Sequence, residues 1–111
     1  MDLKMMLIVH KDKPAVERFA QAVLEEGIAG LTLMPSAGRG RTQGENYDEF
    51  RFSFTHIFES REIPNTTIFS ILPESHIPRM LELLEEHLPG MDDRGTGLYA
   101  VLNVERAGGL S

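Results

Sequence analysis

The chain of 111 residues contains no cysteine, and this absence excludes a disulfide framework, a thiolate metal site and a cysteine nucleophile. It also lacks an apolar run long enough to cross a bilayer, and residues 1–4 lack the basic-then-apolar pattern of a signal peptide. Basic side chains are scarce, because 11 of them face 17 acidic ones and the formal net charge is −6. Such a balance repels a nucleic-acid backbone. We therefore expect a cytoplasmic protein that binds no nucleic acid and does not insert into a membrane.

The composition is that of an ordinary globular protein, with 41% hydrophobic and 25% charged residues. A chain of this length has room for one domain, which we take to be residues 1–111. The core of so small a domain is modest, so that burying more surface by oligomerisation would help to stabilise it.

The first half of the chain predicts a strand, a helix and a second strand. Met5–His10 is an apolar run without polar alternation, which is typical of a strand buried on both faces. A helix is expected to begin near Pro14 and to end at Gly27, since proline suits the first turn and glycine tolerates the positive φ of a helix end. Gly30–Met34 reads as the second strand. The helix carries an apolar stripe at helical spacing, made of Val16, Phe19, Ala20, Val23 and Leu24.

The second half repeats this order. Thr66–Leu72 is rich in β-branched and aromatic residues and predicts the third strand. A second helix is expected after Pro73, with Ser75 as its N-cap and Pro78 tolerated in its first turn. Leu98–Val104 supplies the fourth strand. The buried stripe of the second helix is expected to consist of Ile77, Leu81, Leu84 and Leu88.

The resulting order is β-α-β, a long loop over about residues 36–65, and β-α-β again. This is the split βαβ pattern of an α+β, ferredoxin-like βαββαβ sandwich, with two helices on one face of an antiparallel sheet. The other sheet face needs a cover. With Leu33 and Ile71 available on the strands, we expect this face to pack against other subunits.

Two segments resemble the nitrogen regulatory protein PII superfamily. Glu26–Leu33, followed by Gly38–Gly44, is similar to the strand that leads into the T-loop of that family, and Gly95–Val101 is similar to its later glycine turn. The resemblance implies a homotrimer that binds an adenine nucleotide (AMP, ADP or ATP) between subunits and regulates a protein partner through the T-loop. The positions that match its nucleotide-binding residues are Thr32, Gly38, Gly40, Arg41, Thr42, Gly95, Thr96 and Gly97.

Three departures from the family pattern concern the nucleotide. Thr42 stands where the family has the glutamine that holds Mg²⁺ and 2-oxoglutarate, Leu98 replaces a phosphate-binding lysine, and no arginine pair follows Arg106. Each charge-assisted contact is typically worth roughly 1.5–3 kcal/mol, so triphosphate binding should be weaker. No cofactor is therefore certain, and a mono- or diphosphate nucleotide, a small anion and no nucleotide at all stay open.

The long loop is the expected docking element, because loops of this length in compact domains are usually functional or disordered. Divergent relatives of PII are associated with bicarbonate or metal transport, so a membrane transporter or its regulator is a candidate partner. For the phenylalanines, packing on a strand face or between subunits is favoured over an exposed docking surface, and if they are exposed together they form a patch that requires a partner. The loop residues expected to contact a partner are Arg39, Tyr47, Phe50, Phe52 and Phe54.

The four histidines (His10, His56, His76 and His87) are scattered, with none at i,i+3 or i,i+4 spacing, so we predict no metal site. No nucleophile elbow, metal motif or P-loop is present, and we predict that the protein is not an enzyme. The leading interpretation is a signal-transducing regulator. The alternatives are a trimer like CutA, a related family linked to divalent metals, and a ligand-free protein-interaction module.

Overall fold

The computed structural model describes residues 2–38, 63–91 and 97–110. Within these ranges the chain forms four strands, two α-helices and one short 3₁₀ turn. Their bounds are β1 Leu3–His10, α1 Lys13–Glu26, β2 Thr32–Gly38, β3 Ile63–Pro73, the 3₁₀ turn η2 Glu74–His76, α2 Ile77–His87 and β4 Gly97–Asn103.

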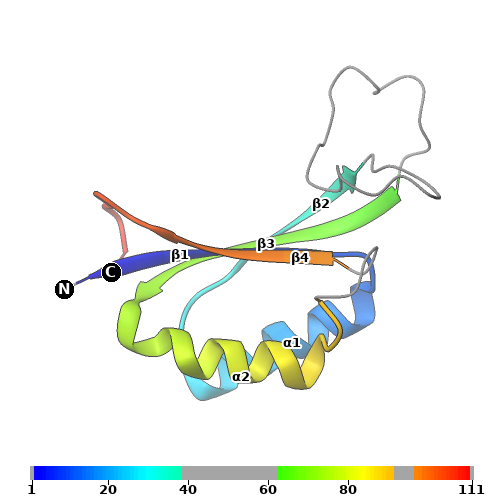
Figure 1. The fold of residues 1–111 in the computed structure, drawn as a ribbon, viewed down its shortest axis with the longest axis horizontal. Helices are drawn as coiled ribbons and strands as arrows, with labels where there is room; N and C mark the ends of the chain where they lie inside the picture. The colour runs from blue at the N-terminus through cyan, green and yellow to red at the C-terminus, as the bar shows by residue number, and fades with distance from the viewer. Residues whose placement is uncertain (1, 39–62, 92–96, 111) are drawn as a thin grey trace.

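The strands form one antiparallel sheet in the order β2-β3-β1-β4, which leaves β2 and β4 at its edges. Both described helices cover the same face of this sheet, and neither lies on the opposite face (Figure 1). The structure thereby confirms the ferredoxin-like α+β arrangement predicted from the order of elements.

Helix α1 has the predicted ends. The Asp12 side chain caps its N-terminus by accepting the Ala15 N–H at 3.1 Å, and Gly27 ends it in the left-handed region with φ 68°. Four of the five predicted stripe residues are buried, but Leu24 is 55% exposed. Leu24 lies outside the part of the helix surface that packs against the sheet.

Helix α2 begins later than predicted. Ser75 is not its N-cap, because residues 74–76 form the 3₁₀ turn and the helix starts at Ile77 without a side-chain cap. Pro78 lies in the first turn, as expected. The buried stripe also differs from the predicted one, because Met80 and Leu83 are buried and do not belong to the predicted set.

The strands beside the long loop extend further than predicted. β2 runs from Thr32 to Gly38 and β3 begins at Ile63, so both take residues that were assigned to the loop. Pro35 lies inside β2, although a proline usually interrupts a strand. β2 tolerates it because an edge strand has no partner on one side, where a missing N–H costs nothing. β4 begins one residue earlier than expected, at Gly97.

The core lies between the sheet and the two helices. Phe19 of α1, Met6 and Ile8 of β1 and Ile68 of β3 are completely buried there. The remaining members of this cluster are Ala15, Val16, Val23, Leu72, Met80, Leu83, Leu84 and Leu88.

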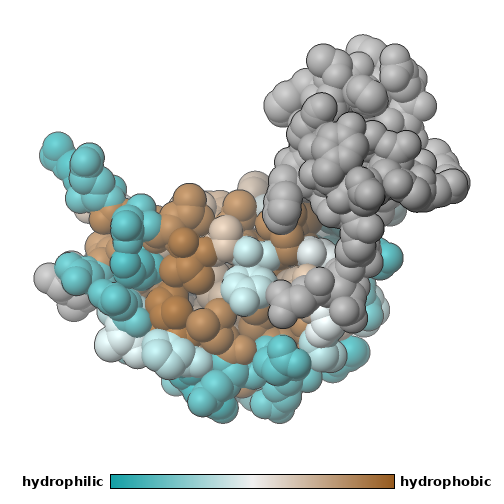
Figure 2. All heavy atoms as spheres, viewed as in Figure 1, coloured by the Kyte–Doolittle hydropathy of each residue, from teal (hydrophilic) through white to brown (hydrophobic). Residues whose placement is uncertain are grey.

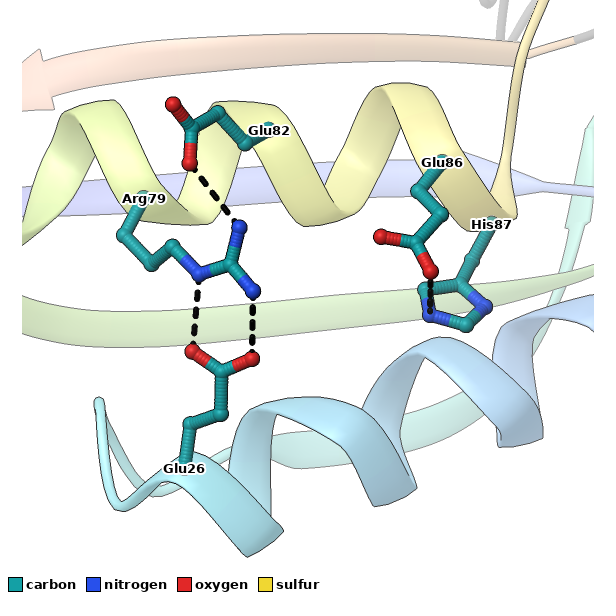
Figure 3. A network of polar contacts seen from close by, with 5 residues as sticks. All are labelled: Glu26, Arg79, Glu82, Glu86 and His87. Carbon is teal, nitrogen blue, oxygen red and sulfur yellow. Dashed lines mark hydrogen bonds and ion pairs between the residues drawn. The ribbon is translucent and has the colours of Figure 1, made fainter.

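The two helices are also joined at the surface (Figure 3). Arg79 of α2 donates two hydrogen bonds to the carboxylate of Glu26 at the end of α1, from Nε at 2.7 Å and from Nη2 at 2.5 Å. Its Nη1 donates to Glu82 one turn along α2 at 2.9 Å. The hydrogen bonds from Arg79 hold the pKa of Glu26 below its usual value. This pair fixes the C-terminal end of α1 against α2.

Candidate functional site

The sheet face opposite the helices is apolar and uncovered by the described part of the chain. Strand alternation and register place its residues: Met5 and Leu7 lie on this face because Met6 and Ile8 face the core. The cross-strand pairs Met5–Ile71, Leu7–Phe69 and Met5–Leu102 extend it to both neighbouring strands. We call this surface the open sheet face, and its apolar members are Leu3, Met5, Leu7, Val9, Met34, Phe69, Ile71, Leu98, Ala100 and Leu102.

Large side chains of the open sheet face still reach solvent, with Met34 41% and Leu102 45% exposed. In the view of Figure 2, which looks along the sheet from its edge, hydrophobic residues gather at the level of the sheet and between it and the helices, and hydrophilic ones lie along the lower border. Two polar residues of the face, Ser36 and Thr67, join their hydroxyl groups in a hydrogen bond of 2.8 Å. Covering the face would therefore bury a hydroxyl pair whose hydrogen bond is already made.

One of the two residues predicted for this face is misplaced. Ile71 lies on the open sheet face, opposite Met5. Leu33 pairs with the buried Ile68 and thus lies on the helix side of the sheet, where it is 38% exposed at the edge. The register of β2 decides this, and the sequence shows no signal for that register.

Three of the predicted nucleotide-binding residues are described, and two of them lie at the same end of the sheet, on its opposite edge strands β2 and β4. Gly97 pairs with His10 at the end of β1, and Gly38 lies at the end of β2 beside the start of β3. Thr32 is six positions back along β2, about 20 Å from Gly38. Two strands separate Gly38 from Gly97, so one subunit does not bring these three residues together. Residues Gly40, Arg41, Thr42, Gly95 and Thr96, and the loop residues Arg39, Tyr47, Phe50, Phe52 and Phe54, lie outside the described residues.

Gly97 has a packing role that needs no ligand. A Cβ atom at this position would lie 2.4 Å from the carbonyl oxygen of Val9 and 3.0 Å from Cδ2 of His10. It would also lie 3.2 Å from the sulfur of Met91. Only glycine lets β4 approach β1 this closely.

His10, for which the sequence pattern predicts no role, is a buried polar residue at the end of the central strand β1, opposite Gly97. Its side chain is only 6% exposed, and its Nδ1 accepts the backbone N–H of Asp12 at 3.1 Å. The neutral ring then carries its proton on Nε2, and this atom has no hydrogen-bond partner among the described residues. Burial lowers the pKa of His10, while the Asp12 carboxylate raises it and the Lys11 charge lowers it. With Nδ1 accepting and Nε2 protonated, this ring offers no lone pair to a metal.

Over residues 2–38, 63–91 and 97–110, no three histidine, aspartate or glutamate side chains stand close enough together to hold a metal ion. Neither described helix is long and apolar enough to cross a membrane. Of the other histidines, His76 lies at the start of α2 and bonds the Ile28 carbonyl through Nδ1 at 2.9 Å, and His87 lies at the end of this helix.

Comparison with known proteins extends the fold assignment. No protein-family profile and no curated protein sequence matches the chain. Among solved structures, CutA from Synechococcus elongatus is similar with a TM-score of 0.64 at 16% identity, over 93% of this chain and 77% of that one. The periplasmic divalent cation tolerance protein CutA from Archaeoglobus fulgidus is similar with a TM-score of 0.64 at 12% identity, over 95% and 86% of the respective chains. At this level of identity the likeness establishes the shared fold.

Proposed function

We propose that the chain is a CutA-like, non-catalytic protein that assembles into a homotrimer through the open sheet face. The observation that carries the proposal is the apolar character of that face across three strands, represented by Leu7, Phe69 and Ala100 in one cross-strand row. An antiparallel sheet with one face in water usually alternates apolar and polar residues along each strand. β1 does not alternate, so both of its faces are suited to burial.

Self-association would bury the open sheet face. Further burial of a half-exposed Leu or Met side chain contributes roughly 1 kcal/mol, and the open sheet face offers several such side chains. A contiguous apolar surface of this kind marks an interaction site more often than a solvated one. The trimeric state itself rests on the resemblance to PII and on the likeness of fold to the CutA proteins.

Divalent cations are the ligands that this proposal favours. One of the structural neighbours is named for divalent cation tolerance. The described residues of one chain form no group of cation ligands, and the proposed site is one shared between subunits. Assembly would then be a condition for binding.

A PII-like regulator that takes an adenine nucleotide is the second candidate. It is favoured by the positions of Gly38 and Gly97, which end β2 and begin β4 at the same end of the sheet. Backbone N–H groups in such glycine turns suit a phosphate. This candidate also requires assembly, because Thr32 would have to come from a neighbouring subunit, and it acts on a protein partner such as a transporter.

Assembly is tested by size-exclusion chromatography with light scattering. The expected mass is three times that of the 12.5 kDa chain. Leu102→Lys is expected to dissociate the trimer into folded monomers, because residue 102 lies on the open sheet face at 45% exposure. Val101→Lys is the matched control, since residue 101 is 41% exposed but points to the other side of the same strand. A monomer at every wild-type concentration would overturn the proposal.

The ligand is tested by calorimetry on the wild-type assembly. Heat with Zn²⁺, Cu²⁺ or Mn²⁺ and none with AMP, ADP or ATP supports the CutA-like protein. Heat with a nucleotide alone supports the PII-like regulator. A trimer that is silent with both sets of ligands overturns both and leaves a ligand-free interaction module.

A further inference from the structure

A cleft of about 390 Å³ lies between the start of α1 and the edge strand β2, and we call it the α1–β2 cleft. Residues 11, 13 and 17 line it from the helix side, and residues 33–36 and 64–66 line it from the strands β2 and β3. This volume lies within the range of roughly 300–1,000 Å³ that is usual for small-molecule sites. It suits a small molecule and is too small for a folded partner.

Four of the seven residues that line the α1–β2 cleft on the strand side are apolar. They are Leu33, Met34, Pro35 and Pro64. Leu33 pairs with the buried Ile68, so it lies on the helix side of the sheet at the border of the core. It is nevertheless 38% exposed, and no described side chain closes over it. The apolar surface in the cleft is therefore available to a ligand.

The rim of the cleft is cationic. Lys11 and Lys13 both line it, and Glu17 is the single acidic residue among the lining side chains. The cleft thus carries an excess of one positive charge in a chain whose net charge is −6. Basic side chains are few in this sequence, and two of them line this cleft together with apolar residues.

Polar groups without charge complete the lining. Asn65 and Thr66, at the start of β3, offer an amide and a hydroxyl group, and Ser36 adds the hydroxyl that bonds Thr67. Such groups orient a ligand and do not select its charge. The charge selection in this cleft comes from the two lysines.

We propose that the α1–β2 cleft binds a small organic anion with an apolar body, such as an aromatic or branched-chain carboxylate or phosphate. The apolar part lies against Leu33 and Pro35, and the anionic group faces Lys11 and Lys13. A cation is disfavoured by the two lysines, and an inorganic anion leaves the apolar residues in water. The inference does not depend on the proposed function, because Lys11, Lys13, Leu33 and Pro35, which carry it, do not belong to the open sheet face, although Met34 and Ser36 of that face also line the cleft.

The test uses protein-observed NMR of the full chain with three probes. Phenyl phosphate combines the apolar body with the negative charge, benzyl alcohol keeps the ring without the charge, and inorganic phosphate keeps the charge without the ring. Phenyl phosphate is expected to shift the backbone amides of residues 33, 36 and 66 saturably. The other two probes are expected to bind at least about tenfold more weakly, because each supplies only one of the two contacts.

The lysines are tested by substitution. The double variant Lys11→Gln, Lys13→Gln is expected to weaken phenyl phosphate about tenfold, whereas Lys11→Arg, Lys13→Arg retains binding. Lys4→Gln is the matched control, because Lys4 bonds Asn103 at the other end of β1. Equal binding of benzyl alcohol, unchanged binding by the glutamine variant, or shifts confined to β4 would each overturn the proposal. A trimer that fails to bind phenyl phosphate overturns this inference alone and leaves the proposed function standing.

Discussion

The Nδ1 atom of His10 accepts the backbone N–H of Asp12 at 3.1 Å, and this bond links the last residue of β1 to the cap of α1. The neutral ring already carries a proton on Nε2, so an added proton has to enter at Nδ1. Protonation of Nδ1 would place its N–H opposite the backbone N–H of Asp12 and break the hydrogen bond between the two residues. The β1–α1 corner is therefore compatible only with a neutral His10.

Acidification is expected to destabilise the fold through this residue. Burial holds the pKa of His10 below its ordinary value of 6.5, and the unfolded chain takes up the proton first as the pH falls. The contribution of His10 to stability is intact above pH 6.5 and decreases as the pH falls from there toward the folded pKa. Denaturant midpoints measured between about pH 7.5 and about pH 5.5 should show this loss.

His10→Gln provides the comparison, because the glutamine amide does not titrate and its oxygen can accept the Asp12 N–H. The variant is expected to have a flatter pH profile in the same window. A ring-proton NMR titration of the wild type gives the pKa directly. A His10 pKa above 6.5 in the folded protein would contradict the prediction.

Asp12→Ala is expected to destabilise the protein by about 1 kcal/mol, as is usual for the loss of an N-cap. The Asp12 side chain accepts the Ala15 N–H at 3.1 Å, and alanine leaves this first-turn donor without its acceptor. Asp12→Asn keeps a cap oxygen and should cost much less. Chemical denaturation at neutral pH measures both variants, and equal losses would exclude capping as the cause.

Gly97→Ala is expected to cost about 1–3 kcal/mol, because its methyl group would lie 2.4 Å from the Val9 carbonyl oxygen and force β4 away from β1. Gly30→Ala is the control, since a Cβ at Gly30 meets nothing within 4 Å. Thermal unfolding should separate the two variants. If Gly97→Ala is as stable as wild type but loses ligand binding, the glycine serves a ligand and not the packing.

The ion pair between Arg79 and Glu26 is expected to give a small stabilisation that weakens with salt. Both side chains are well exposed, with 44% and 38% accessibility, so solvent screens their attraction. Because the hydrogen bonds from Arg79 lower the pKa of Glu26, this stabilisation is present at neutral pH and is lost as the pH falls through that lowered value. A double-mutant cycle of Arg79→Ala and Glu26→Gln at two salt concentrations measures the coupling, and Arg18→Ala is the exposed control on α1. A coupling that grows with salt would refute the ion-pair explanation.

Most of the fold was predictable because local sequence patterns determine its helices and strands. The apolar run of β1, the stripe of α1 and the glycine after it each have a direct physical reading, and the structure agrees with them. The errors occur where a tertiary contact decides. Pro35 lies outside the predicted strand Gly30–Met34, yet it is part of β2, which tolerates a proline because it is an edge strand.

The site was less predictable for the same reason. Which face Leu33 occupies depends on its pairing with Ile68, and such a pairing across the long loop has no local signal. The burial of His10 likewise depends on the approach of Gly97 and Met91 from the far end of the chain. The α1–β2 cleft joins residues of three elements, and only the folded chain brings them together.

The apolar character of both faces of β1 and β3 has a consequence for how the strands find their alignment. In a half-buried sheet, a slip of one residue moves apolar side chains into water, and that cost fixes the register. Here a slip of one residue would replace the apolar side chains on one face of the strand by the apolar side chains of its other face. Discrimination then falls to the few polar side chains that fit one alignment only, such as Ser70, whose buried hydroxyl donates to the Gly30 carbonyl at 2.7 Å. In this protein, a hydrogen bond of that kind would specify which face of β3 turns toward the helices, and hydrophobic burial would supply the strength of the pairing.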